Sequence, residues 1–461
     1  MEHARELARF ALSATCEDLS GAAREALKLR ILDSVGCALG AMDGPPVRCL
    51  RDYVEAFGGE PRSTLIGGGG TAPDRASLLN GTLVRYLDFN DSYLAPGETC
   101  HPSDNLAAVL AATEEAGGDG RDLMTALAVA YQVQCRLSDV APVRERGFDH
   151  VTHLAFSVAA GVARALRLDE DAATDAVAIA GTTGNALRVT RTGAISQWKG
   201  LAAPWAAANA LRAAFLASRG VTGPREVFEG TRGWRETVSG SWTLDWSAED
   251  LERVTRTDLK RFNAEIHSQA ALEGLLELLE EASVDAADID AVRVGIFDVA
   301  FDIIGGGREG EKTRVESKEQ ADHSLPWLLA VAALDRQVLP EQYAPERIGA
   351  DDVQALMRRV VIERDPDLSE RFPDEHACRL TVTTRSGRAL TREKRTYQGF
   401  HAEPVPWEMV EAKARRLGEG RLEPADLDRL VEAVRHLEDA ELHDLLGPLS
   451  RARTHAFQAV G

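Results

Sequence analysis

The densest group of reactive side chains flanks a short Pro-Gly loop in the first quarter of the chain. Asp88, Asp91 and Ser92 precede the loop, and His101 follows it. A carboxylate near a loop histidine can orient a general base and tune its protonation. The same residues also fit a structural role, in which Asp91 and Asp104 cap helices and His101 is a polar loop residue. The spacing alone leaves both roles open.

A second group contains two histidines, His150 and His153, which follow Asp149 at the start of an apolar segment. Two histidines three residues apart on a helix can bind a metal ion, but no third ligand stands at a recognisable spacing. We therefore expect no metal site here. The remaining alternatives are a single histidine that faces a cleft, a helix cap, or a residue at the edge of the core.

Basic residues form the third group. Arg188, Lys199 and Lys260 lie in segments that are otherwise poor in acids, and residues 185–207 contain none. A lysine near the start of a buried helix suits anion binding, since the backbone N–H groups add to its field. Solvated surface lysines are the plain alternative. A fourth patch, Asp322–Ser324, stands at the head of an apolar helix, where a cap is the default interpretation.

The sequence lacks the motifs that other catalytic chemistries require. No G-x-G-x-x-G follows a predicted strand, the glycine run near residue 68 lacks the Lys-Ser/Thr of a P-loop, and no G-x-S-x-G elbow is present. The six cysteines are scattered without a C-x-x-C pair, which argues against a disulfide scaffold, a zinc ribbon and an iron–sulfur cluster. Acid–base chemistry without a cofactor is therefore the main enzymatic option.

The composition is that of a folded globular protein. The 461 residues are 44% hydrophobic and 27% charged, and the net charge of −20 makes nucleic acid or an anionic membrane a poor partner. No window contains the roughly 18 apolar residues that a membrane span needs. The N-terminal segment is expected to form an amphipathic helix and not a signal peptide. We therefore expect a cytoplasmic protein.

Hydrophobic spacing predicts the elements that must position these groups. Apolar residues recur with helical periodicity in the first part of the chain, over residues 22–41, 104–116, 121–138, 153–167, 170–184 and 201–219. Alanine and glycine are frequent inside these stretches, so their helices should pack closely and be buried on all sides.

The pattern changes after about residue 260. Short β-branched runs at 291–297 and 357–363 and a hairpin formed by 377–384 and 388–397 predict strands, with a helix at about 318–334 between the first two runs. Helical spacing returns after Trp407. We expect a mainly α protein with an α+β part: a helical domain over 1–260, a smaller α+β lid domain over 261–399, and C-terminal helices over 400–461 that pack back on the helical domain.

The ordered motifs identify a family resemblance over residues 20 to 450. Among the segments that carry it are LLNGTLVRYLDFNDSYL, CHPSDNLAAVLA, GFDHVTHLAFSVAAGVARAL and ADHSLPWLLAVAAL. The chain resembles the MmgE/PrpD family, and the sequences of these motifs look like those of its 2-methylcitrate dehydratase branch. The resemblance implies a helical domain with a smaller α+β lid, a homodimer, and a small di- or tricarboxylate substrate.

The resemblance also implies site residues and a reaction. Carried over by position, the catalytic residues are Asp88, Ser92, His101 and His150, and the substrate-binding residues are Lys199, Lys260, Arg188 and Asp91. The implied reaction is cofactor-independent dehydration of 2-methylcitrate or a related tricarboxylate. In our hypothesis His101, oriented by Asp88, handles one proton, and His150 or Ser92 handles the other. The residues do not decide which histidine is the base.

Three positions depart from the family pattern. Arg85 stands where many members have histidine, Asn90-Asp91 replaces a pair of aspartates, and Trp327 replaces a tyrosine whose hydroxyl an indole cannot replace as an acceptor. Glu98 would disfavour a third substrate carboxylate if it points toward the site. Decarboxylation of cis-aconitate, epimerisation of a dicarboxylate, and a non-catalytic dimeric binding protein therefore stay open as alternatives.

Overall fold

The computed structural model of the protein describes residues 3–454. The chain forms two compact units. The first consists of Met1–Arg188, Gly200–Thr257 and Pro406–Gly461, and the second of Val189–Lys199 and Asp258–Val405. Within residues 3–454, no helix combines the length and apolar character needed to cross a membrane.

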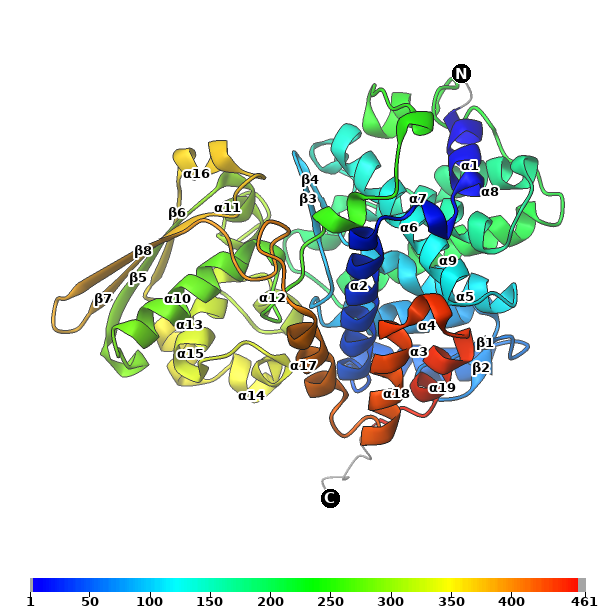
Figure 1. The fold of residues 1–461 in the computed structure, drawn as a ribbon. Helices are drawn as coiled ribbons and strands as arrows, with labels where there is room; N and C mark the ends of the chain where they lie inside the picture. The colour runs from blue at the N-terminus through cyan, green and yellow to red at the C-terminus, as the bar shows by residue number, and fades with distance from the viewer. Residues whose placement is uncertain (1–2, 455–461) are drawn as a thin grey trace. The chain divides into compact units, whose positions relative to one another are not determined.

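The first unit is helical (Figure 1). In chain order its helices are α1 (His3–Ser13), α2 (Gly21–Gly40), α3 (Pro45–Phe57), α4 (Pro73–Tyr86), α5 (Leu106–Glu115), α6 (Gly120–Val140), α7 (Val151–Ala165), α8 (Glu170–Thr183), α9 (Trp198–Ala217, the first two residues of which belong to the second unit), α17 (Trp407–Gly418), α18 (Pro424–Arg435) and α19 (Leu442–Ser450). The helices predicted from hydrophobic spacing are confirmed, including an amphipathic α1 that buries Leu7 and Ala11.

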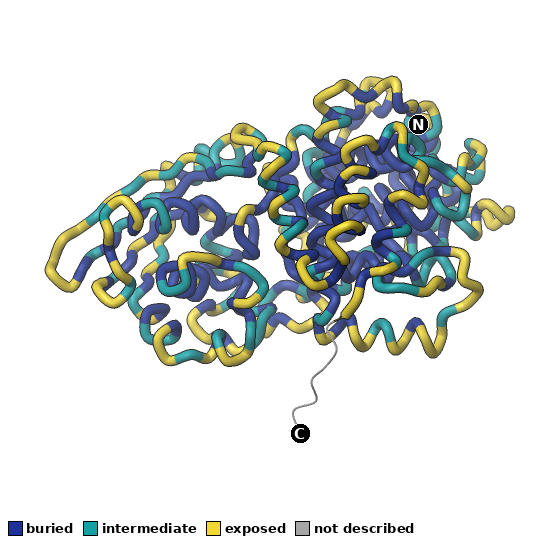
Figure 2. Tube along the Cα trace, turned by 60° about the horizontal axis from the view of Figure 1, so that its bottom comes forward, coloured by how far each residue is buried: buried dark blue, intermediate teal, exposed yellow. Residues whose placement is uncertain are grey.

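Small residues allow the close helix packing that the sequence predicts. Helix α7 lies against α6 at Gly161, where a methyl group would lie 2.9 Å from the carbonyl oxygen of Ala126. Helix α17 lies against α2, and a methyl group on Gly36 would lie 2.8 Å from the Cα of Ala414. Figure 2 shows the result as long buried stretches in the middle of this unit. Larger side chains at these glycines would push the helices apart.

The second unit is built on a four-stranded sheet in the order β6-β5-β7-β8. The strands are β5 (Ile289–Ile296), β6 (Val360–Arg364), β7 (Cys378–Thr384) and β8 (Ala389–Lys394). Strand β6 runs parallel to β5, and the other neighbours are antiparallel. Helix α10 (Gln269–Glu281) packs on β7 and β8, and α13 (Leu325–Asp335) packs on β6. The remaining helices are α11 (Asp298–Ile304), α12 (Lys318–Ala321), α14 (Pro345–Ile348), α15 (Asp351–Met357) and α16 (Pro366–Arg371).

This architecture confirms the expected mainly α fold with an α+β part, and one of the predicted helices is interrupted. The segment predicted as a single helix over 318–334 is interrupted at Asp322–Ser324. Ser324 ends the interruption as an N-cap, because its Oγ accepts a hydrogen bond from the N–H of Trp327 at 3.2 Å. Pro326 stands in the first turn of α13, where its missing N–H costs nothing.

Candidate active site

A short hairpin in the first unit brings Ser92 and His101 together. Its strands β3 (Tyr93–Ala95) and β4 (Glu98–Cys100) are joined by a turn in which Gly97 has a φ of +85°. Tyr93 pairs with Cys100 in the register, so Ser92 and His101 are the next facing residues. The Ser92 Oγ accordingly lies 3.0 Å from Nδ1 of His101.

The imidazole of His101 is buried, and its Nδ1 has fixed neighbours. Nδ1 lies 2.7 Å from the main-chain carbonyl oxygen of Asp91. Because a carbonyl oxygen can only accept, Nδ1 carries the proton, and the neutral ring has its lone pair on Nε2. This tautomer is the one that a general base acting through Nε2 requires.

Asp91 supports the turn that follows His101. Its Oδ1 accepts hydrogen bonds from the N–H and Oγ of Ser103 at 3.0 and 2.6 Å, and its Oδ2 accepts one from the Tyr131 hydroxyl at 2.7 Å. Burial raises the pKa of this fully enclosed carboxyl, although these hydrogen bonds oppose the shift. The sequence-based prediction placed Asp91 among the substrate-binding residues. Both of its oxygens are bonded to protein donors, which favours a positioning role, and its assignment to substrate binding stays a prediction.

Asp88 is paired with an arginine inside the protein. Arg85 Nη1 donates to Asp88 Oδ1 at 2.7 Å, and Nε of the same arginine lies 3.7 Å from Asp104 Oδ1. Asp88 has a φ of +58°, in the left-handed region that few residues other than glycine adopt. Nδ1 of His101 is held by Asp91 and Ser92, so the hypothesis that Asp88 orients His101 stays a prediction.

The second predicted histidine lies directly beside the first. His150 precedes helix α7, and its Nδ1 is 3.2 Å from Asp149 Oδ1, which also accepts the N–H of Val151. The rings of His101 and His150 meet edge to face, with centroids 5.2 Å apart. The fold thus brings the two histidines together from segments that are about fifty residues apart.

His153 points elsewhere. Its Nε2 donates to the carbonyl oxygen of Ala141 at 2.8 Å, and its ring packs against Trp234. Burial lowers the pKa of His153, in keeping with a neutral core residue. This geometry favours the core-edge alternative for His153.

Two more charged residues of the first unit have structural contacts. The guanidinium of Arg188 lies 3.9 Å from Asp149 Oδ2, on the carboxylate that contacts His150. Glu98 Oε2 accepts the main-chain N–H groups of Val143 and Arg144, both at 3.0 Å. These hydrogen bonds connect the β3–β4 hairpin to the loop before α7.

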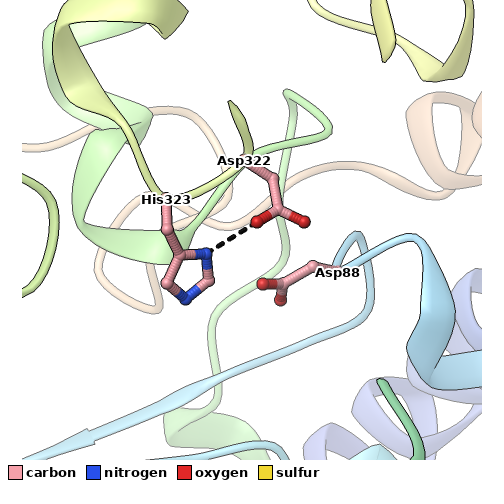
Figure 3. A group of neighbouring side chains, drawn as sticks. All are labelled: Asp88, Asp322 and His323. Atoms are coloured by element: carbon pink, nitrogen blue, oxygen red, sulfur yellow. Dashed lines mark hydrogen bonds and ion pairs between the residues drawn. The ribbon is translucent and has the colours of Figure 1, made fainter. Parts of the chain in front are cut away.

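In the second unit, Lys199 belongs to a buried ionic cluster around Asp322. The Lys199 Nζ lies 2.7 Å from Asp322 Oδ1 and 3.0 Å from His323 Nδ1, and Lys318 Nζ lies 2.7 Å from Asp322 Oδ2. Figure 3 shows the ring of His323 turned toward the Asp322 carboxylate, with Nδ1 2.8 Å from Oδ1. Burial acts to raise the pKa of Asp322, but the two lysines and His323 hold it far below its usual value.

These contacts also bear on metal binding. Asp322 and His323 are ligand types that divalent metals accept. Both oxygens of Asp322, however, are bonded to ammonium groups, which repel a cation. The cluster is better suited to hold anions.

Lys260 lies near a second carboxylate of this unit. Glu265 Oε1 is 2.6 Å from His267 Nδ1. Burial acts to raise the pKa of Glu265, but His267, His323 and Lys260 together lower it to about 2. Lys260 itself is 2% exposed. Both predicted lysines are thus buried cations.

Sequence reasoning missed part of this group. The patch Asp322–Ser324 was interpreted as a helix cap; Ser324 is that cap, whereas Asp322 and His323 belong to the ionic cluster. The available signal was the triplet Asp-His-Ser followed by Leu-Pro, since Ser324 alone satisfies the helix start and leaves Asp322 and His323 for another role. Trp327 is fully buried against Tyr343, and its Nε1 has no hydrogen-bond partner in the described part of the chain.

Comparison with known proteins agrees with these features. The model of the MmgE/PrpD N-terminal domain matches residues 5–247, and that of the MmgE/PrpD C-terminal domain matches residues 262–439. A 2-methylcitrate dehydratase of Salmonella typhimurium (strain LT2) is 27% identical over 377 residues, which cover 77% of this chain and 76% of the relative.

Two further relatives cover more of the chain. A mitochondrial 2-methylcitrate dehydratase of Yarrowia lipolytica is 26% identical over 90% of this chain and 84% of its own length. A cis-aconitate decarboxylase of Mus musculus is 24% identical over 90% of this chain and 86% of its own length. Because the N-terminal domain model alone spans more than half of the residues, the chain belongs to the MmgE/PrpD family.

Proposed function

We propose that the protein is a hydro-lyase that dehydrates 2-methylcitrate or a related tricarboxylate by general acid–base catalysis. The observation that carries this proposal is the buried pair His101 and His150, whose rings are 5.2 Å apart and whose Nδ1 atoms each have a fixed neighbour. Similarity to dehydratases of this family supports the reaction class.

In the proposed mechanism, His101 is the base. Dehydration begins when a proton is removed from the carbon beside a substrate carboxylate. The Nδ1–H of His101 is fixed on the Asp91 carbonyl, so Nε2 can accept that proton. Ser92, at 3.0 Å from Nδ1, is a second anchor of the ring.

His150 supplies the second proton. The C–O bond breaks as the carbon–carbon double bond forms, and the departing hydroxyl takes a proton and leaves as water. The Asp149 carboxylate beside Nδ1 can stabilise the charge of a protonated His150. The assignment of base and acid between the histidines is part of the proposal.

Buried cations bind the substrate carboxylates in this proposal. Lys199 and Lys260 are each 2% exposed, and Arg188 lies next to the Asp149–His150 pair. Cations in a dry environment stabilise the negative charge that develops on a carboxylate during proton removal. We further propose that no cofactor takes part and that the protein acts as a homodimer.

Product analysis tests the reaction class. Purified, chelator-treated protein is incubated in parallel with 2-methylcitrate, citrate and cis-aconitate, and products are identified by NMR. Conversion of 2-methylcitrate to its dehydrated product is the expected result. Release of CO₂ from cis-aconitate would instead establish the decarboxylase, which the 90% coverage by the mouse relative keeps as a second candidate. Activity that the chelator abolishes would contradict the cofactor-free proposal.

The His101→Ala variant tests the catalytic assignment. Loss of a general base is expected to lower kcat by about 10²- to 10⁴-fold. His443→Ala is the matched control, because that side chain is 81% exposed. Near-normal turnover of the His101 variant in the same assay would remove His101 from the mechanism.

A further inference from the structure

Lysine is rare in this protein, and its side chains are shielded from solvent. The chain has 53 basic residues, of which seven are lysines. None of the seven is exposed, and three of those in the second unit are nearly inaccessible: Lys199 and Lys260 at 2% and Lys312 at 5%. Lysine is rarely buried without a partner. Lys199 was predicted from the sequence to bind substrate, and so was Lys260, but Lys312 was not.

Lys312 is attached to the ionic cluster by its main chain. Its carbonyl oxygen accepts the Oγ of Ser324, the residue that follows His323 and caps α13. Burial is the largest influence on its ammonium group and lowers its pKa, and the charge of Lys199 acts in the same direction. The charges of Glu309, Glu265 and Asp322 oppose this shift.

The ammonium group of Lys312 has no direct partner in the described structure: no hydrogen bond or ion pair reaches its Nζ from residues 3–454. Of the three carboxylates whose charges act on Lys312, Asp322 and Glu265 are bonded to other residues. Asp322 is bonded to Lys199 and Lys318, and Glu265 is bonded to His267. A buried cation without a partner is costly, so an anion from outside the chain is the natural complement.

We propose that Lys312 is a further substrate-binding residue, whose ammonium group binds one carboxylate of the di- or tricarboxylate ligand. This inference rests on the proposed function. A carboxylate of the ligand supplies the negative charge that Asp322 and Glu265, as bonded here, do not supply to Lys312. An ammonium group presents three donors at a point charge and suits a carboxylate without demanding one geometry.

Ligand binding to Lys312→Met tests the inference. Tricarballylate, a tricarboxylate without a leaving hydroxyl, is titrated into the full-length protein by calorimetry. A charged hydrogen bond of ordinary strength corresponds to an affinity loss of about 10- to 100-fold. Arg314→Met is the matched control, since it removes a cation two residues away whose side chain is 78% exposed. Unchanged affinity in Lys312→Met would overturn the inference.

Thermal unfolding separates binding from a structural role. Without ligand, Lys312→Met should unfold at the same or a higher temperature than the wild type, because it removes a buried charge that has no bonded partner. With tricarballylate, the rise in Tm seen for the wild type should shrink or vanish. A large fall in the Tm of the unliganded variant would instead make Lys312 a structural residue and overturn the inference.

Two further variants keep the test decisive if Lys312→Met does not fold. Lys312→Arg keeps the charge and Lys312→Gln removes it, so affinity should follow the charge in that pair, and equal affinities would refute a carboxylate contact. If the wild type binds no tricarballylate and turns over no tricarboxylate, the proposed function fails as a whole. If the wild type binds and all Lys312 variants bind equally, only the present inference fails.

Discussion

At the scale of single residues, the two histidines are held by neighbours of different kinds. Nδ1 of His101 is fixed by an uncharged carbonyl, while Nδ1 of His150 faces the carboxylate of Asp149. A carbonyl fixes the tautomer of the neutral ring, whereas a carboxylate also favours the protonated ring. This difference is the physical reason for the roles of base and acid proposed above.

Asp149→Asn isolates the effect of that charge. The amide can still accept the N–H of Val151, so the start of α7 should be kept, while the negative charge next to His150 is lost. We expect kcat to fall by about 10²-fold, with the alkaline limb of the pH–rate profile displaced to lower pH. The profile is measured by initial rates between pH 5 and 9. A loss of Tm without a change in the profile would assign Asp149 to structure only.

At the scale of elements, the β3–β4 hairpin sets the position of both Ser92 and His101. Its turn depends on Gly97, whose positive φ strains any residue with a side chain. The Cβ of an alanine there would meet Pro142 at an ordinary 3.6 Å, so the cost comes from the backbone and not from a clash.

Gly97→Ala should therefore lower the free energy of unfolding by about 1 kcal/mol and reduce kcat, because the facing pair is displaced. Both are measured, by urea denaturation and by initial rates. Gly21→Ala provides the comparison: the new methyl group meets no atom within 4 Å and φ is not positive, so stability should hold or rise slightly. Equal behaviour of the two variants would show that the turn does not position the site.

The long helices could be predicted from the sequence, whereas the short hairpin and the contact between the two histidines could not. Long periodic helices such as α2 and α6 were predicted within a few residues, because a buried stripe leaves a repeating pattern. The β3–β4 hairpin was expected to be a loop, since three-residue strands are too short to alternate visibly. His101 and His150 could be nominated from the sequence, but their contact depends on packing between distant segments, which no local pattern encodes.

At the scale of the whole molecule, buried ionisable groups govern stability toward acid. His376 is 1% exposed, neither ring nitrogen has a hydrogen-bond partner in the described chain, and its ring lies against Tyr397 and Phe297. Burial lowers the pKa of His376 to about 3. The unfolded chain therefore binds a proton at this residue below about pH 6.5 while the folded chain does not, and stability falls as the pH drops from there toward 3.

His376→Leu should reduce this acid sensitivity. Between pH 7 and pH 5 the free energy of unfolding should fall by about 2 kcal/mol less than in the wild type. Urea denaturation at pH 7 and at pH 5 measures this change in the free energy of unfolding. A packing defect that lowers stability equally at the two pH values does not affect the change. The same substitution at the exposed His443 controls for the loss of one imidazole. An unchanged pH dependence in His376→Leu would mean that His376 titrates with the same pKa in the folded and the unfolded chain.

The covered lysines have a practical consequence for anyone who attaches the protein to a surface or a dye. Coupling through lysine side chains would have to reach partly or wholly covered positions, among them Lys199 and Lys260, and should inactivate the protein in proportion to the coupling. Thiol chemistry offers the alternative, because Cys49 is exposed whereas the other five cysteines are buried. A maleimide should therefore conjugate at one defined place on helix α3 and leave the proposed catalytic groups untouched.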